Sequence, residues 1–355
     1  MEQAKEKNRI KAVNIVFLVT ILLSIAASFL PLDFLGEIPV LNLVFSQLLI
    51  LLPSVVYMLI NRIPYKEAVR FRKMKPGDIA LSILFGILIQ PAMTLINALS
   101  MVFATNTTSN FLVEMSRQVP LFVSLFFIAA VPAVLEETVY RGVFFNEYRK
   151  VDVWKGALLS GLLFGLMHGN LNQFCYATLM GFLFALLIEA TGSILSTMLV
   201  HFWTNSGSVV MIYLYPKLYE VAKNFYNMYV EYGNTEMAEQ LELAFGTMTL
   251  TGEEWMQQIM DVSSMMTLSV PEVLVMYGPT AVLAGVLAYF VYKKLAKRNG
   301  TWDYICGKSK RQPENTGVAL EPEEKKRLVT VPLLVAIVLS VAFMIFYEIV
   351  VRMTM

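Results

Sequence analysis

Two histidines and a pair of glutamates stand in apolar parts of this chain, where ionisable side chains are uncommon. His168 ends the stretch Phe-Gly-Leu-Met-His, and His201 begins the stretch His-Phe-Trp-Thr-Asn. Glu136 and Glu137 follow the apolar residues Ala-Val-Leu. Ionisable groups inside a membrane-spanning segment are energetically expensive, and they usually mark ion paths, proton relays or catalytic sites. These residues are therefore the first candidates for chemistry.

A glutamate and two histidines are the ligand types of a catalytic zinc site, in which a fourth position is left for water. Bound zinc lowers the pKa of that water towards about 7 and so creates hydroxide at neutral pH. Glu136, His168 and His201 would be the ligands, and a second carboxylate could accept the proton. The amide of Asn205 could donate hydrogen bonds to a developing oxyanion. The groups thus predict amide hydrolysis, with a divalent metal ion, Zn²⁺, as the expected cofactor.

Spacing within each stretch indicates which side chains share a helix face. Glu137 and Arg141 are four residues apart and can pair, which leaves Glu136, about 100° around the helix, facing elsewhere. His201 and Asn205 have the same spacing and can point into one cavity. We expect Glu137 and Arg141 to support the site rather than to act in it.

The elements that carry these residues are predicted to be membrane-spanning helices. Of the 355 residues, 57% are hydrophobic and only 15% are charged, and the charges cluster between long apolar runs. A helix needs roughly 20 apolar residues to cross the hydrocarbon core. We therefore expect an all-α, polytopic membrane helix bundle with about nine transmembrane helices. The runs are 13–31, 39–61, 79–104, 120–140, 153–169, 172–190, 193–215, 270–292 and 328–350.

The candidate residues fall at similar depths in this arrangement. Glu136 lies 13 residues before the basic pair at Arg149, and His168 lies 13 residues after Lys155, so each is about 20 Å from the same face. His201 lies nine residues after Gly192, or about 13 Å from it. Three helices could therefore bring one carboxylate and two imidazoles into one cavity.

Basic residues indicate the orientation of the bundle. With a cytoplasmic N-terminus, the segments 1–12, 62–78, 141–155 and 293–327 face the cytoplasm and contain 24 of the 28 lysines and arginines. This bias follows the positive-inside rule, and it places no basic residue deep in a span. We expect an integral protein of a bacterial plasma membrane. The near-neutral net charge of +1 argues against nucleic acid as a partner.

The chain divides into four predicted regions. Residues 1–118 hold N-terminal transmembrane helices, 119–215 the catalytic core, and 270–355 two further helices around a basic cytoplasmic loop near anionic lipid. Segment 216–269, which is acidic, is expected to form one to three amphipathic helices outside the membrane. Thr251, followed three residues later by Glu254, is typical of a helix start. The sequence leaves open whether this outer segment is a functional cap or a solvated linker.

The ordered motifs resemble a known family. Glu136-Glu137 with Arg141, then Phe164 with His168, then His201 with Asn205 are similar to the motifs of the CPBP family. This family contains CAAX prenyl endopeptidases and bacteriocin-processing proteins and is also called Abi. The stretches His-Gly-Asn after residue 167 and Glu-Ala-Thr-Gly-Ser-Ile after residue 188 are similar as well. The resemblance covers roughly residues 119–215.

The resemblance implies an intramembrane metalloprotease. Glu136, His168 and His201 would carry catalysis, and Asn205 would support the oxyanion. Glu136 is expected to be either a metal ligand or the general base that activates water, and we favour zinc. The implied substrate is a membrane-associated peptide or membrane protein within the lipid bilayer, and prenylated substrates are not assumed.

Two other functions are compatible with the same residues. A non-catalytic membrane regulator, partnered with a sensor kinase, or a bacteriocin self-immunity protein would explain the long outer segment and the basic loop. An ion- or proton-coupled transporter would use the polar residues as a relay. The transporter is disfavoured because the sequence has no paired repeats.

Overall fold

The computed structural model describes residues 2–30, 39–265, 268–309 and 327–354, and these residues form helices and connecting turns without any strand. Seven helical stretches in them are long and apolar enough to cross a membrane, so the prediction of an all-α, polytopic bundle is confirmed. These stretches are Arg9–Ser28, Val40–Ile60, Pro76–Met101, Leu121–Tyr148, Leu171–Thr191, Val270–Arg298 and Val331–Thr354.

The other two predicted spans are helical but differ from the rest. Helix α10 (Val153–Leu166) has only 14 residues. Helix α12 (Ile194–Glu231) has 38 residues, and polar side chains such as Thr204 and Asn205 reduce the hydropathy of its first half. One of these helices leads directly to His168 and the other contains His201. The two histidines are thus positioned by the two predicted spans that are too short or too polar to be recognised as membrane-spanning helices.

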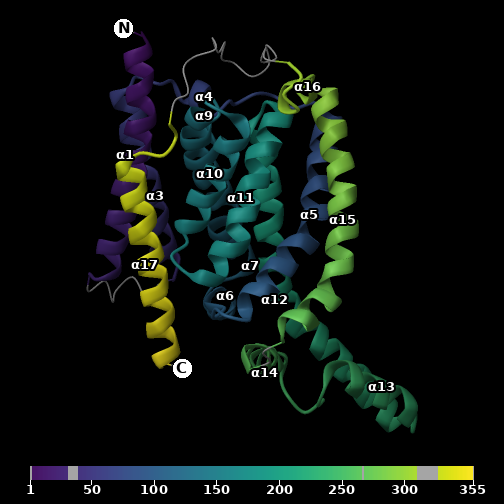
Figure 1. Cartoon of the computed structure of the whole chain (residues 1–355). Helices are drawn as coiled ribbons and strands as arrows, with labels where there is room; N and C mark the ends of the chain where they lie inside the picture. The colour runs from purple at the N-terminus through teal and green to yellow at the C-terminus, as the bar shows by residue number, and fades with distance from the viewer. Residues whose placement is uncertain (1, 31–38, 266–267, 310–326, 355) are drawn as a thin grey trace.

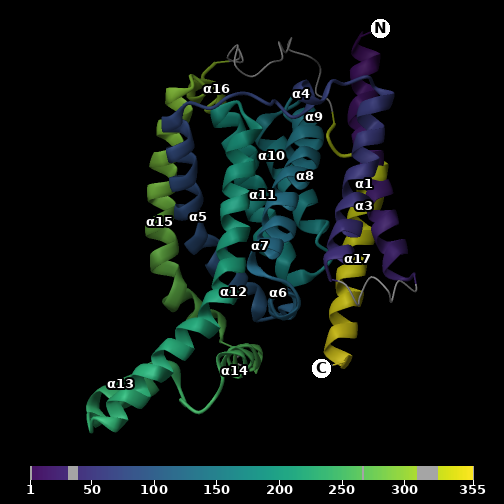
Figure 2. The same cartoon turned by 180° about the vertical axis from the view of Figure 1, so that it is seen from behind.

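The bundle has three groups of helices side by side. Helices α1 (Glu2–Ser28), α3 (Pro39–Ile60) and α17 (Val331–Thr354) lie along one side, and α5 (Pro76–Met101) and α15 (Val270–Arg298) lie along the other (Figures 1 and 2). Helices α10, α11 (Leu171–Thr191) and α12 lie between them. The two chain termini lie at opposite ends of the bundle (Figure 1). The short helices α4 (Tyr65–Ala68) and α16 (Trp302–Ile305) lie at the end of the bundle that holds the N-terminus (Figure 1). Helix α6 (Thr107–Gln118) lies at the opposite end of the bundle.

Helices α10 and α11 pack with their backbones in contact. A Cβ atom added to Gly161 would lie 2.6 Å from the backbone nitrogen of Phe182, and one added to Gly181 would lie 2.8 Å from the Cα of Gly161. Small residues allow this close approach between membrane helices, where packing replaces the hydrophobic driving force of water. The contact fixes the helix that precedes His168 in the centre of the bundle.

The fourth span is one helical rod with two widened segments. It runs through α7 (Leu121–Ser124), η1 (Leu125–Ala130), α8 (Val131–Glu137), η2 (Thr138–Phe145) and α9 (Asn146–Tyr148). The segments η1 and η2 are π-helical, a rare conformation that is frequent at functional sites. The short α8 between them carries the double glutamate and packs against α3 and α12.

Arg141 corrects one prediction. Its side chain is fully buried within the rod Leu121–Tyr148, so a basic residue does lie deep in a span. The predicted span ends at residue 140, which placed Arg141 in the following loop, whereas the helical rod continues to Tyr148. Here Glu137 compensates its charge, as the pair described below shows.

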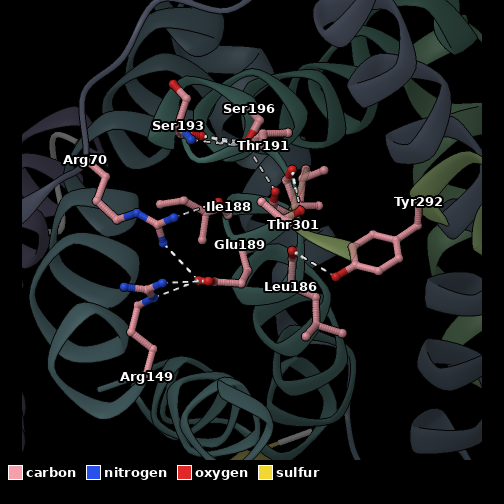
Figure 3. Close-up of polar contacts among 12 residues, drawn as sticks. Arg70, Arg149, Leu186, Ile188, Glu189, Thr191, Ser193, Ser196, Tyr292 and Thr301 are labelled. Atoms are coloured by element: carbon pink, nitrogen blue, oxygen red, sulfur yellow. Dashed lines mark hydrogen bonds and ion pairs between the residues drawn. The ribbon is translucent and has the colours of Figure 1, made fainter. Parts of the chain in front are cut away.

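A buried ion cluster joins several elements at the N-terminal end of the bundle (Figure 3). Glu189, near the end of α11, accepts hydrogen bonds from Nε and Nη2 of Arg149 at 2.7 and 2.6 Å. Nη1 of Arg70 donates to the same carboxylate at 3.1 Å. Burial, together with repulsion from Arg149, lowers the pKa of Arg70 to about 10. Both arginines therefore remain charged at neutral pH, and one glutamate holds them.

The second half of α12 extends beyond the bundle and forms an arm with α13 (Thr235–Phe245) and α14 (Gly252–Met265) (Figures 1 and 2). We call residues 216–259 the arm. Helices are thus confirmed in this segment, whereas their place outside the membrane stays a prediction. The helix start at Thr251 is confirmed too, since Glu254 accepts from the Thr251 backbone at 2.8 Å and donates its own N–H to the Thr251 hydroxyl at 3.2 Å. Part of the predicted basic loop, residues 310–326 with Lys310 and Arg311, lies outside the described residues.

Candidate active site

Glu137 is the centre of a buried network. Its Oε1 atom accepts from Nη1 of Arg141 at 2.9 Å, and neither side chain is exposed. The predicted pairing of these two residues is therefore confirmed. The same oxygen lies 2.9 Å from Nδ1 of His201 on α12. Because a carboxylate only accepts, this ring nitrogen carries a proton, and in a neutral ring Nε2 has a free lone pair.

Glu136 faces a different set of groups. Its Oε1 atom accepts from the Nε2 amide of Gln47 on α3 at 2.8 Å. Its Oε2 atom lies 3.8 Å from Nε2 of His201. The two glutamates therefore approach opposite nitrogens of one imidazole ring, as their different helix faces predict.

His168 lies beside this pair at the end of α10. Its Nδ1 atom lies 2.7 Å from the backbone carbonyl oxygen of Phe164. A carbonyl accepts only, so Nδ1 carries the proton and Nε2 is again the free acceptor of the neutral ring. The ring of Phe164 contacts both His168 and His201, and His201 lies near Glu136, so the structure brings the three predicted catalytic residues into one region of the bundle.

Aromatic rings separate the site from the rest of the bundle. The buried ring of Phe164 lies nearly perpendicular to both histidine rings, with centroid distances of 4.9 Å to His168 and 5.9 Å to His201. The guanidinium of Arg141 lies 4.5 Å from the Phe164 centroid and 5.2 Å from that of Phe184. Such contacts stabilise a desolvated cation and restrict its position. Phe164 therefore orients both imidazoles and the arginine at once.

Asn205 lies one helical turn beyond His201, where it contacts the widened segment η1. Its Nδ2 donates to the backbone oxygen of Ile128 at 3.0 Å. A side-chain amide has two N–H groups, so one donor remains for another acceptor. A hydrogen bond thus joins Asn205 to the rod that carries the glutamates, and the second N–H of its amide can donate to another acceptor.

The described residues do not form a ready metal site. The donor types and the free Nε2 atoms of His168 and His201 suit a divalent ion. However, within the described ranges no three side chains of His, Cys, Asp or Glu come close enough together to hold a metal ion. The donor types suit zinc, but the described side chains are not close enough together to bind it as they stand. The zinc prediction therefore stays a prediction.

Gln47, which is not among the predicted site residues, belongs to the site through its contact with Glu136. An amide in the middle of an apolar run is a polar exception, and this signal could have identified Gln47. Phe184 was missed as well, since nothing distinguishes one phenylalanine of α11 from the other apolar residues of that helix.

Comparisons with known proteins agree with this location. Residues 117–207 match the family described as Type II CAAX prenyl endopeptidase Rce1-like. The chain is 31% identical over 101 residues to a Bacillus subtilis protein named "Putative membrane peptidase YdiL". That alignment covers 28% of this chain and 41% of the relative, so the chain matches about two fifths of the relative's length. No solved structure matches the chain. The matched segment contains every predicted site residue, whereas Gln47 lies outside it.

Proposed function

The central region of this chain, residues 117–207, belongs to the CPBP family, and from this premise we propose that the protein is an intramembrane endopeptidase. Its apolar helices make it an integral membrane protein. The substrate we propose is a peptide or protein that is itself associated with the membrane. The N-terminus would face the cytoplasm of a bacterial cell, as the basic residues indicate.

One geometric relationship carries the proposal. Oε2 of Glu136 and the free Nε2 of His201 are both acceptors, and they face each other across 3.8 Å in a buried position. Two acceptors cannot bond to each other, so a group that serves both must carry donor hydrogens or positive charge. A water molecule meets this requirement. Held by two acceptors, it is polarised for attack on a carbonyl carbon.

In the proposed reaction, Glu136 acts as the general base. Water oxygen forms a bond to the carbonyl carbon of the scissile peptide, and its proton moves to the Glu136 carboxylate. The resulting tetrahedral intermediate expels the amine as the C–N bond breaks. Glu136 returns the proton to the leaving nitrogen, and the products are a carboxylic acid and an amine. The remaining N–H of Asn205 would stabilise the oxyanion.

Glu137 and Arg141 would act through His201. The carboxylate of Glu137 fixes the tautomer of the ring by accepting from Nδ1, so that Nε2 stays available for the water. Arg141 keeps Glu137 ionised in a buried place. His168 would supply a second free Nε2 acceptor from the other side, with Phe164 holding its ring.

Comparison of wild type with Glu136→Gln tests the proposal. Both proteins are reconstituted in liposomes with a membrane extract, and newly formed peptide N-termini are identified by mass spectrometry. The wild type is expected to generate a set of new termini that Glu136→Gln and His168→Gln do not generate. Glu114→Gln, on the exposed helix α6, is the matched control and should behave as wild type. Equal cleavage by wild type and both site variants would contradict the proposal.

Metal content is measured on the same preparations. The sequence predicts about one zinc per chain. Bound zinc would polarise a water molecule and the substrate carbonyl, and Glu136, His168 and His201 would be the residues to hold it. Zinc that is present in the wild type and lost in Glu136→Gln and His201→Gln would support that prediction. Cleavage by metal-free protein would support water activated by Glu136 alone.

A non-catalytic regulator or immunity protein is the second candidate, because the arm lies outside the matched segment 117–207. A deletion phenotype that is complemented equally by wild type and by His168→Ala would favour this candidate. Failure of the variant to complement would favour the peptidase.

A further inference from the structure

An exposed apolar stripe begins on α12 at Leu214, two residues before the arm, and continues along the arm to Tyr232, the residue that follows the helix. Six apolar residues recur at alternating spacings of four and three, and their exposed fractions range from 37% to 80%. They are Leu214, Leu218, Val221, Phe225, Met228 and Tyr232. This spacing is the a/d repeat by which one helix packs lengthwise against another helix. We call these six residues the seam.

No part of the described arm covers the seam. Helix α13 and the following turn pack on a different face of α12, through Tyr219, Ala222 and Tyr226. These positions lie roughly 100° around the helix from the seam at 3.6 residues per turn. The stacked rings of Tyr219 and Trp255, with centroids 5.0 Å apart, belong to the same covered face. The arm is therefore held together without the seam, which remains available for another helix.

Charge determines which helix would fit. Between residues 216 and 259 the arm has seven acidic and two basic side chains. Lys223 bonds to the carbonyl oxygen of Leu250 at 2.7 Å, so one of the two cations is engaged within the arm. Most of the acidic side chains are exposed. The exposed ones are Glu231, Glu236, Glu239, Glu242, Glu253 and Glu254.

This charge disfavours two occupants of an apolar stripe. Helices that lie on a membrane surface carry Lys and Arg beside the apolar face, because lipid headgroups are often anionic. A second copy of this chain would bring the same acidic excess, and like charges across an interface cost free energy. An apolar helix with basic flanks has neither conflict.

We propose that the seam of the arm binds a cationic amphipathic helix of another polypeptide. The apolar side of that helix packs on the seam, and its lysines or arginines face the acidic side chains of the arm. The seam begins 13 residues after His201 on the same helix, about 20 Å along its axis, so a bound polypeptide is held within reach of the bundle. The binding does not depend on the proposed peptidase activity.

The test measures binding of a fluorescent model helix made of leucine and lysine. Full-length protein is placed in phosphatidylcholine nanodiscs, empty nanodiscs give the background, and fluorescence anisotropy gives Kd. Leucine–glutamate and leucine–glutamine helices are the comparison peptides. We expect the cationic helix to bind at least about tenfold more tightly than either, with an affinity that falls as salt rises. The Glu136→Gln protein should bind as tightly as wild type, which separates this proposal from the catalytic one.

Two variants examine the seam and the charge separately. Val221→Ser with Phe225→Ser should weaken binding about tenfold or more, because two apolar contacts are lost. Val230→Ser is the matched control, since Val230 is 52% exposed on the opposite side of α12. Glu236→Gln with Glu239→Gln should weaken binding and reduce its salt dependence. Circular dichroism shows whether the variants keep their helix content. The single variant Leu218→Gln removes one apolar contact of the seam and should weaken binding while the helix is retained.

Three results would overturn the proposal. The first is equally tight binding of the anionic helix, and the second is unchanged affinity of the folded seam variants. The third is efficient disulfide cross-linking between copies of Phe225→Cys in nanodiscs that hold two chains, which would assign the seam to self-association.

Discussion

Nε2 of His201 lies 3.8 Å from Oε2 of Glu136, on the side of the ring opposite to the nitrogen that Glu137 holds. Adjacent glutamates thus share one imidazole but meet different atoms of it. Glu137 is compensated by Arg141. Glu136 keeps an oxygen that no described hydrogen bond uses. Two carboxylates next to each other in sequence therefore have different partners, and we propose that Glu137 is structural and Glu136 catalytic.

Replacing each glutamate by glutamine should separate these tasks. Glu137→Gln leaves the buried Arg141 without its counter-charge, which we expect to cost about 3–5 kcal/mol of stability. Glu136→Gln should keep the fold and remove cleavage. Thermal unfolding in detergent and the cleavage assay together measure both effects. In Glu137→Gln with Arg141→Met, most of the lost stability should return; a double variant as unstable as the single one would contradict the pairing.

Gln47→Leu should reduce cleavage without unfolding the protein. The Gln47 amide donates to Glu136 at 2.8 Å, and its loss frees the carboxylate to rotate. A hydrogen bond to a charged group contributes about 1.5–3 kcal/mol, so kcat should fall roughly ten- to hundredfold. Gln90→Leu is the matched control, because Gln90 bonds to Thr204 instead. Equal loss in both variants would indicate a general packing defect.

Glu189→Gln should destabilise the N-terminal end of the bundle. It would leave Arg70 and Arg149 buried without a carboxylate, at a cost of about 3–5 kcal/mol. Glu114→Gln removes an exposed pair with Arg117 and should cost less than about 1 kcal/mol. Unfolding temperatures of the two variants give the comparison, and similar values would show that the cluster does not stabilise the fold.

The pKa of Glu254 provides a pH-dependent prediction. Hydrogen bonds from the backbone and hydroxyl of Thr251 lower this pKa below its ordinary value. A lowered pKa means that the contribution of the cap is present above the ordinary glutamate range and is lost as pH falls through the folded value. NMR titration of the labelled carboxyl carbon measures it. Thr251→Ala should raise the pKa, whereas Thr249→Ala should not.

Contacts within one helix could be predicted from the sequence. The pairs Glu137–Arg141 and Phe164–His168 depend only on helical spacing, and both are present. Contacts between helices could not be predicted in the same way. Gln47 meets Glu136 across 89 positions, because the rotation of α3 against α8 depends on packing along both helices.

The widened segments η1 and η2 also have no sequence signal. Their residues read as ordinary apolar helix, although η1 presents the carbonyl of Ile128 to Asn205. The buried position of Arg141 was missed because the apolar run ends at residue 140, although helical spacing already paired this residue with Glu137. The division of the chain into the four regions 1–118, 119–215, 216–269 and 270–355 stays a prediction, since no comparison tests these boundaries.

The close contact between α10 and α11 is possible because glycine has no side chain, and the position of the site depends on this contact. Gly161 and Gly181 touch where any larger residue would wedge the helices apart. Since α10 leads to His168, a single added methyl group at either glycine would move an imidazole away from a carboxylate several turns distant. Two glycines outside the candidate site are therefore positions at which even a methyl group is too large for the space available.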